Sequence, residues 1–415
     1  MNFINMVSSS LARIPMTILR NRPRSSLVTA ALLVTSFSMS LALTSCGGSE
    51  EVLLGRRSEV LAALGTNVIL PSYRTLQTRA GALDTAIATF VASGLPADRD
   101  AARVAYLALM ESVAEVEMMT VGPLGAATQT PGGQDLFDEM YSWVVVPLSL
   151  CGIDRFLAGS TYQDATVLGA EPLNIRGLGA IDYLLFVDTT ANACGANAEI
   201  NTNGTWATLS ADADALAVRR AEMAKVLSAQ VKERADALVA AWDPAFLLEF
   251  TDPTRDGALY DSAQEGLNAV ADALFVLDQV TKDLRLVTPA GIRNCATDTC
   301  PEALESQYAG DNKERILANL VAYRLIITGG DGLGFDDLLV DVGAGTFATD
   351  MLAHIDAAIA AVGEVDGTLA EALVSDLDDV RALHDAVQLC STDLKTTFLA
   401  VLSLDPPNRA GSDND

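Results

Sequence analysis

The chain is poor in the residues that hydrolytic enzymes most often use. It has two histidines in 415 residues, His354 and His384. Neither lies in an HExxH motif or near a second histidine at metal-ligand spacing. The sequence also has no GxSxG motif, no P-loop and no GxGxxG segment after a strand. These absences leave little support for zinc-dependent hydrolysis, a serine nucleophile or a nucleotide-binding loop.

Basic residues are scarce as well. The chain has 27 lysines and arginines against 54 aspartates and glutamates, a net charge of −27. Such a surface repels phosphate, so we expect no nucleic-acid partner. Charged residues make up 20% of the chain and hydrophobic residues 50%, which is enough to bury a large core.

The first 45 residues have the features of an export signal. They contain four arginines and no acidic residue, and an apolar run over residues 27–43 leads into TSCG around Cys46. This order predicts a secretory signal peptide over residues 1–45. Its end resembles a bacterial lipobox, so we expect lipid on Cys46 to anchor the protein to the membrane. Gly47 fits an outer-membrane lipoprotein facing the periplasm, and Met16 could be the true start. The alternative is a single membrane-spanning anchor, for which the run is short.

The six cysteines suit an exported protein. With Cys46 lipidated, Cys295 and Cys300 could close a small loop, and Cys151 and Cys194 could staple the segment between them. A zinc site at Cys295 and Cys300 lacks a second pair of ligands. The sequence alone does not decide the pairing.

The rest of the chain is dominated by helical patterns. Residues 46–58 are expected to be a tether, and beyond them apolar residues recur at spacings of three and four, with no alternation typical of strands. We therefore predict an all-α fold, with an N-terminal bundle over 59–250 and a C-terminal bundle over 258–404. The pattern indicates one long last helix with a core stripe from Leu369 to Val401. Residues 405–415 are expected to be a disordered tail.

The most informative segment is RGLGAIDYLLF at residues 176–186. Glycines permit a turn or a close approach that a side chain would block, and the apolar residues then fit a buried helix. Asp182 lies inside this helix and must be solvated, paired or bound to a ligand. The alternative is a tight turn into a core helix, with Asp182 serving only the helix dipole.

A second segment, GLGFDDLL, is similar to GLGAIDYLL. It places Gly332, Gly334, Asp336 and Asp337 before a further helix. We interpret the pair as a diverged internal duplication, although so short a match can arise by chance in a chain rich in Leu, Gly and Asp.

The first motif resembles that of the imelysin-like family, which carries GxHxxE within a stretch much like RG(F/L)HAIEYLLF. Arg176, Gly177 and the Tyr-Leu-Leu-Phe tail match, while Gly179 replaces the histidine and Asp182 the glutamate. The segment AEVEMMTVGP resembles another family segment and adds Glu117. The resemblance implies two helical bundles related by pseudo-symmetry, with a cleft lined by both GLG segments. It also implies a periplasmic lipoprotein in a family associated with iron uptake and once classed as metallopeptidases.

These residues suggest a site for a hard cation. Asp182, Glu117 and Glu115 could bind iron or another oxygen-liganded ion if their helices pack together, and Asp336 and Asp337 could supply a mirrored set. The alternative is that these acids cap helices and face water.

Three functions follow from these observations. The first is an envelope-anchored binding module for a metal ion or small ligand, working with envelope transport partners and without catalysis. The second is a metallopeptidase-like hydrolase of the imelysin type. The third is a degenerate family member that acts as an interaction scaffold.

Overall fold

The computed structural model describes residues 47–141, 143, 147–253, 255–256 and 258–407. The predicted signal peptide, Cys46 and the end of the predicted tail lie outside these residues. The segment expected to be a tether is helical from Gly47 onward and belongs to α1 (Gly47–Ala63). This helix runs directly into the π-helix η1 (Leu64–Ile69) and then into α2 (Leu70–Ser93). Pro71, which has no N–H to donate, is the second residue of α2 and directly follows the π-helical turn η1, where the regular hydrogen-bond pattern of the helix is already interrupted.

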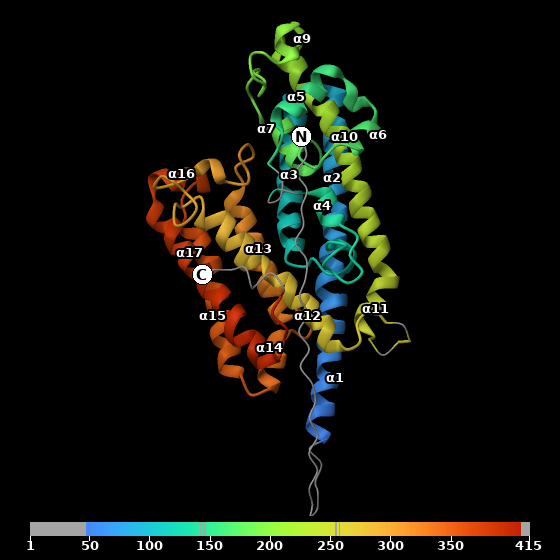
Figure 1. Cartoon of the computed structure of the whole chain (residues 1–415), viewed down its shortest axis with the longest axis vertical. Coiled ribbons are helices and arrows are strands. Elements are labelled where there is room, and N and C mark those ends of the chain that lie inside the picture. Colours follow the sequence, from blue (N-terminus) through green and yellow to red (C-terminus); the bar gives the residue numbers. More distant parts are fainter. Residues whose placement is uncertain (1–46, 142, 144–146, 254, 257, 408–415) are drawn as a thin grey trace, which may run out of the picture. The chain divides into compact units, whose positions relative to one another are not determined.

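The first half of the chain forms one group of packed helices (Figure 1). The long helices α2, α3 and α10 pack against one another or against α7, and Asp212 caps α10 by accepting bonds from the Asp214 and Ala215 N–H groups. Beyond α1 to α2, its elements are α3 (Pro96–Glu117), η2 (Gly122–Leu124), α4 (Leu136–Met140), α5 (Leu150–Gly159), η3 (Thr161–Gln163), α6 (Ala165–Gly169), α7 (Gly177–Phe186), α8 (Glu199–Thr202), α9 (Thr205–Leu209), α10 (Ala213–Ala241), η4 (Trp242–Phe246) and α11 (Leu247–Thr251).

In the second half, α13, α15, α17 and η5 pack together. Its elements are α12 (Ala263–Leu274), the π-helix η5 (Leu277–Val287), η6 (Pro301–Ala303), α13 (Asn312–Thr328), α14 (Phe335–Asp341), α15 (Gly345–Glu364), α16 (Leu369–Ser375), α17 (Leu377–Asp393), η7 (Leu394–Phe398) and α18 (Leu399–Leu402). The predicted single last helix is wrong in one respect. It breaks at Asp376, whose backbone is non-helical and whose side chain caps α17 through the Asp379 N–H.

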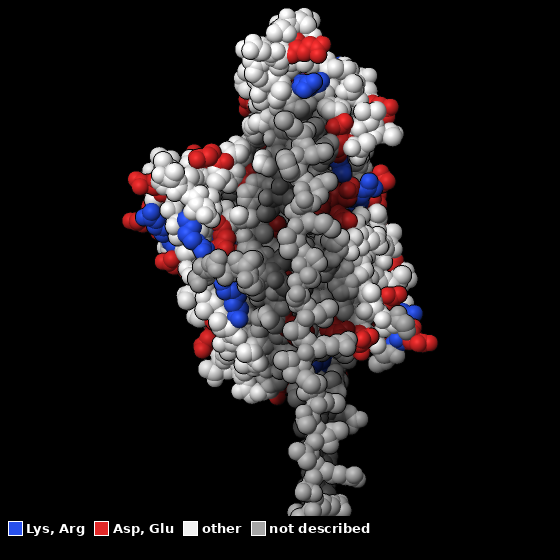
Figure 2. Space-filling view, viewed as in Figure 1, with Lys and Arg blue, Asp and Glu red and all other residues white. Residues whose placement is uncertain are grey.

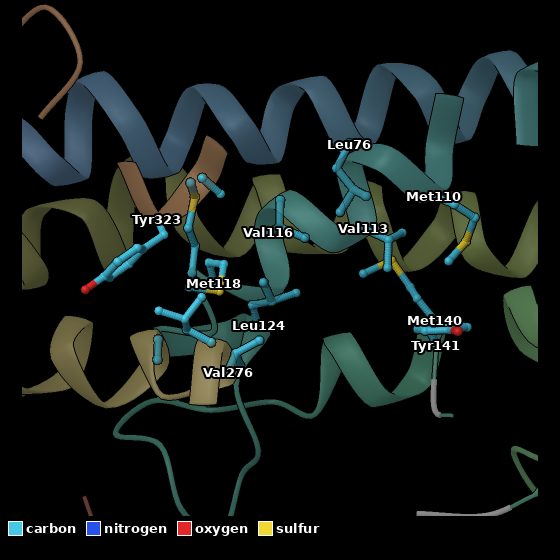
Figure 3. Packing of buried hydrophobic residues seen from close by; sticks show 14 of the residues in the cluster. Leu76, Met110, Val113, Val116, Met118, Leu124, Met140, Tyr141, Val276 and Tyr323 are labelled. Atoms are coloured by element: carbon cyan, nitrogen blue, oxygen red, sulfur yellow. The ribbon is translucent and has the colours of Figure 1, made fainter. Parts of the chain in front are cut away.

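The two halves share one hydrophobic core. The described residues form one compact unit, and the main contact between its halves is α3 against α13. Figure 3 shows part of this core. Leu76 of α2, Val116 of α3 and Tyr323 of α13 are buried in the same group of side chains, together with Val276 from the link between α12 and η5. The described residues are helical without strands, so the all-α prediction is confirmed. The pseudo-symmetry of the halves stays a prediction.

On the face drawn in Figure 2, acidic and basic side chains are scattered among uncharged residues. Within the part of the chain that the structure describes, no helix has the length and apolarity needed to cross a bilayer.

Candidate functional site

The first motif begins with a glycine that no other residue replaces easily. Gly177 starts α7 with a φ of +76°, and a Cβ on it would lie 2.7 Å from the carbonyl oxygen of Met140. Arg176, just before it, donates from both terminal nitrogens to Glu139, at 2.9 and 3.1 Å. It also donates from Nε to the Glu171 carbonyl. This arginine therefore fixes the entry to α7 against α4 and does not line the pocket described next.

Gly179 and Asp182 lie one turn apart on α7 and line the same pocket. The cavity is about 380 Å³ in volume and lies between the first half of the chain and residues 302–308. Aromatic, apolar and acidic side chains make up most of its lining, which comprises Tyr106, Tyr141, Trp143, Pro147, Leu148, Leu150, Gly179, Asp182, Glu302, Ala303, Leu304, Glu305, Gln307 and Tyr308. Because Gly179 has no side chain, the cavity reaches the helix backbone at this point. A Cβ there would meet only Leu148 Cδ1, at 3.4 Å.

Asp182 is the acidic group of α7 in this pocket. Its side chain is 6% exposed, and Oδ1 accepts a hydrogen bond of 2.9 Å from the Ala309 N–H. Burial raises the pKa of Asp182 to about 7, and the negative charges of Asp311 and Glu305 add to this rise. Arg315 and the Ala309 N–H oppose it. Asp182 therefore loses its proton near neutral pH, where most carboxyl groups are already ionised.

Behind the pocket lies a network of buried ion pairs that joins the two halves. Arg285 of η5 contacts Glu117 of α3 at 2.8 Å and Glu305 at 2.6 Å, and all three side chains are at most 8% exposed. Arg315 of α13 lies 3.2 Å from Glu305. Tyr141 donates its hydroxyl to Glu305 at 2.5 Å.

The two carboxyl groups of this network differ in pKa because their arginine neighbours differ. Burial alone would raise the pKa of Glu305, but Arg285 and Arg315 lower it to about 2. Among the described residues, Arg285 is the one cationic side chain paired with Glu117, and burial raises the pKa of Glu117. Glu305 therefore stays ionised, and its charge is paired with those of Arg285 and Arg315.

The structure separates the three acids that were predicted to bind a cation. Glu117 pairs with Arg285, Glu115 accepts a hydrogen bond of 2.7 Å from Ser72, and Asp182 faces the pocket. Among the described residues, no group of three or more His, Cys, Asp or Glu side chains is placed to hold a metal ion. The three acids therefore do not form a cation site.

The second GLG segment does not line this pocket, contrary to expectation. A Cβ on Gly332 would lie 2.6 Å from Asn67 Nδ2, and one on Gly334 would lie 2.2 Å from the Ile327 carbonyl oxygen. The Gly334 N–H donates to Asp337, and Asp336 accepts a bond from the Asp337 N–H. Both acids thus serve the start of α14, and Figure 1 shows α14 well apart from α7. These glycines permit close packing and do not face the first motif.

Two disulfides lie in the described part of the chain. The structure joins Cys151 to Cys194 and Cys295 to Cys300, while Cys390 is buried and unpaired. The first ties α5 to the segment after α7, and the second closes a short loop before residues 302–308 of the pocket.

Sequence reasoning missed the arginines of the network. The available signal was a polar pattern on the buried stripe of α13, where Asn312, Arg315 and Asn319 recur at spacings of three and four and are at most 1% exposed. A polar residue on such a stripe needs a buried partner. Here Asn319 donates to the Ala114 carbonyl at 2.6 Å and to Glu117.

The fold and the pocket together define the class: an all-α protein with a cavity of ligand size between its two halves. Residues 69–396 match the family model described as Imelysin, and the chain belongs to this family. Two crystal structures share its fold. One is from Parabacteroides distasonis and is assigned as an iron-regulated protein A precursor, with 18% identity and a TM-score of 0.63 over 84% of this chain and 94% of that one. The other is an imelysin-like protein from Psychrobacter arcticum, with 15% identity and a TM-score of 0.65 over 85% and 96% of the two chains. No curated protein matches the chain.

Proposed function

We propose that this protein is an envelope-anchored binding module that holds a small ligand or a complexed metal ion in the pocket of Gly179 and Asp182, without catalysis. The observation that carries the proposal is the pocket itself. Its volume of about 380 Å³ falls in the range of small-molecule sites. It lies at the two positions where the family motif has its histidine and glutamate, and Asp182 is a buried acid in its wall.

The pocket residues do not fit a resident metal ion held by the protein alone. Three carboxylates line the pocket, but Glu305 is already occupied by Arg285 and Arg315, and the described residues group no three His, Cys, Asp or Glu side chains around an ion, so Asp182 and Glu302 do not complete a metal site. Histidine is absent from the lining. A metal ion bound here would have to bring further donors of its own, as a chelated ion does. A role in iron uptake is part of the proposal and is supported by the family and by the assignment of the Parabacteroides distasonis protein.

The location is proposed from the sequence. A lipid on Cys46 would attach the protein to the outer membrane facing the periplasm, where envelope transport components would be its partners. Radiolabelled palmitate incorporation, compared between the natural chain and Cys46→Ser, tests this attachment.

Calorimetry on chelator-treated protein tests the binding function. We expect heat on titration with phenethylammonium or with a neutral iron(III) chelate, tris(acetohydroxamato)iron(III), and a loss of that heat in Asp182→Asn. A chain that binds none of the ligands, including calcium and zinc, would favour the scaffold function. Peptide hydrolysis that stops on chelation would favour the metallopeptidase.

A further inference from the structure

We propose that the pocket is selective for an organic cation, meaning an ammonium group carried on an apolar or aromatic body. This inference rests on the proposed binding function and specifies its ligand class. It follows from three features of the pocket: its excess of negative charge, the buried acceptor at Asp182, and the aromatic walls.

The charges around the pocket do not cancel. The two buried arginines are matched by three carboxylates, because Arg285 contacts Glu117 and Glu305 while Arg315 contacts Glu305 and Asp311. Asp182 is a fourth carboxyl group beside this network, and Glu302, an exposed acid in the pocket lining, is a fifth. An anionic ligand would meet this excess of acid and find both guanidinium groups already occupied. A cation would restore neutrality, and burial strengthens that attraction.

Asp182 is placed to receive the charged end of the ligand. Its side chain lines the cavity, is 6% exposed and accepts one hydrogen bond from the backbone of Ala309 through Oδ1. A carboxylate has capacity for further hydrogen bonds, and burying it ionised without a partner is costly. An ammonium group supplies both donors and the opposite charge in a single contact.

The walls suit the rest of such a ligand. Trp143 and Tyr308 line the cavity and are only partly buried, so their rings remain accessible from it. Aromatic faces attract cations, and indole does so most strongly. Tyr141 already has the guanidinium of Arg315 at 5.7 Å from its ring centroid, so the pocket contains one such contact within the protein. Apolar side chains, including Leu148 and Leu150, complete the lining.

The alternative of a bare metal ion fits less well. A cavity of about 380 Å³ is far larger than one ion needs, and the described residues group no three metal-ligating side chains. An apolar body attached to the cation would fill the remaining volume and bury the aromatic surface.

Three probes with the same body and different charge test the inference. Calorimetry on the full chain in detergent at pH 8 would compare phenethylammonium with 2-phenylethanol and with phenylacetate. We expect the ammonium to bind at least tenfold more tightly than the alcohol, and the carboxylate to give no measurable binding. The indole of Trp143 should report the same binding as a change in fluorescence.

Variants locate the effect. Asp182→Asn keeps the acceptor for Ala309 and removes the charge, so we expect at least a tenfold loss of ammonium affinity. Trp143→Ala should lose several-fold. Asp350→Asn, an exposed acid on α15, is the matched control and should bind like the natural chain. Circular dichroism establishes that each variant is folded.

The outcomes separate this inference from the proposed function. Equal affinity for the ammonium and the alcohol, or unchanged affinity in folded Asp182→Asn, overturns the organic-cation inference and leaves a pocket for neutral ligands. Binding of the neutral iron(III) hydroxamate chelate that depends on Asp182, without binding of the ammonium, also overturns it while the binding function stands. A chain that binds neither the three probes nor this chelate overturns both.

Discussion

Asp182→Asn gives the sharpest test of the raised pKa of Asp182 in the pocket. In the folded chain the pKa of this carboxyl is raised from 3.8 to about 7, chiefly because it is buried. A raised carboxyl pKa means that folding favours the protonated form. Wild-type stability therefore falls as pH rises from about 4 to about 7, and it stays at the lower value above that window. An amide does not titrate, so the variant loses this contribution to the pH dependence.

The size of the effect follows from the two pKa values. A difference of one pH unit corresponds to about 1.4 kcal/mol, so the change from 3.8 to about 7 sets an upper value of about 4 kcal/mol. The carboxyl is almost fully buried, and screening by solvent reduces this value little. We expect the difference in unfolding free energy between Asp182→Asn and the wild type to grow by about 2–4 kcal/mol between about pH 4 and pH 8, in favour of the variant.

Urea unfolding followed by circular dichroism at several pH values measures this difference. Other acids also titrate in this window, but they are common to both chains and cancel in the comparison. Asp350→Asn controls for the loss of one negative charge from an acidic protein, and its difference from the wild type should not change with pH. Parallel stability curves for the wild type and Asp182→Asn would refute the assignment of a raised pKa to Asp182.

Three further changes test the surroundings of the pocket. Arg285→Met leaves two buried carboxylates without their shared partner and should cost about 3–5 kcal/mol in urea unfolding; a cost below about 1 kcal/mol would show that the ion pairs are not desolvated. Replacing Cys151 and Cys194 by serine opens a loop with a sequence separation of 43 and should cost about 4 kcal/mol, against about 2 kcal/mol for the second, shorter disulfide; thermal and urea unfolding of the two double variants compares them. Gly177→Ala should destabilise the chain by about 1–3 kcal/mol because of its positive φ and the nearby carbonyl, whereas Gly179→Ala should gain up to about 1 kcal/mol from helix propensity; equal effects at the two glycines would contradict the geometry of α7.

The fold class and the importance of the first motif were accessible from the sequence, whereas the cleft predicted between the two GLG segments is not found among the described residues. Helical periodicity is a local signal, and a glycine turn followed by an acid inside an apolar helix marks residues 176–186 without any knowledge of the fold. The pairing of charges was not accessible, because Glu117 and Arg285 are 168 residues apart and meet only after both halves have folded. The sequence alone does not show which residues so far apart will pair.

The second GLG segment shows how a similar pattern can serve another purpose. Glycine is required where backbones approach closely, and Gly334 meets this need next to the Ile327 carbonyl. In the first motif, Gly179 instead leaves open space beside a cavity. The sequence shows glycine at both positions. Only the atoms around each Cα show that Gly334 allows close packing and that Gly179 leaves room for a cavity.

The ion pairs between Glu117, Arg285 and Glu305 also restrict how the two halves of this protein can move. A clamshell opening of the two helix groups would strip buried guanidinium and carboxylate groups of their partners, at a cost comparable to the stability of a whole domain. The halves therefore move together, and a ligand of the proposed pocket would reach it beside partly exposed lining residues such as Trp143 and Tyr308 without separation of the halves. A binding site that is formed before its ligand arrives loses little affinity to ordering.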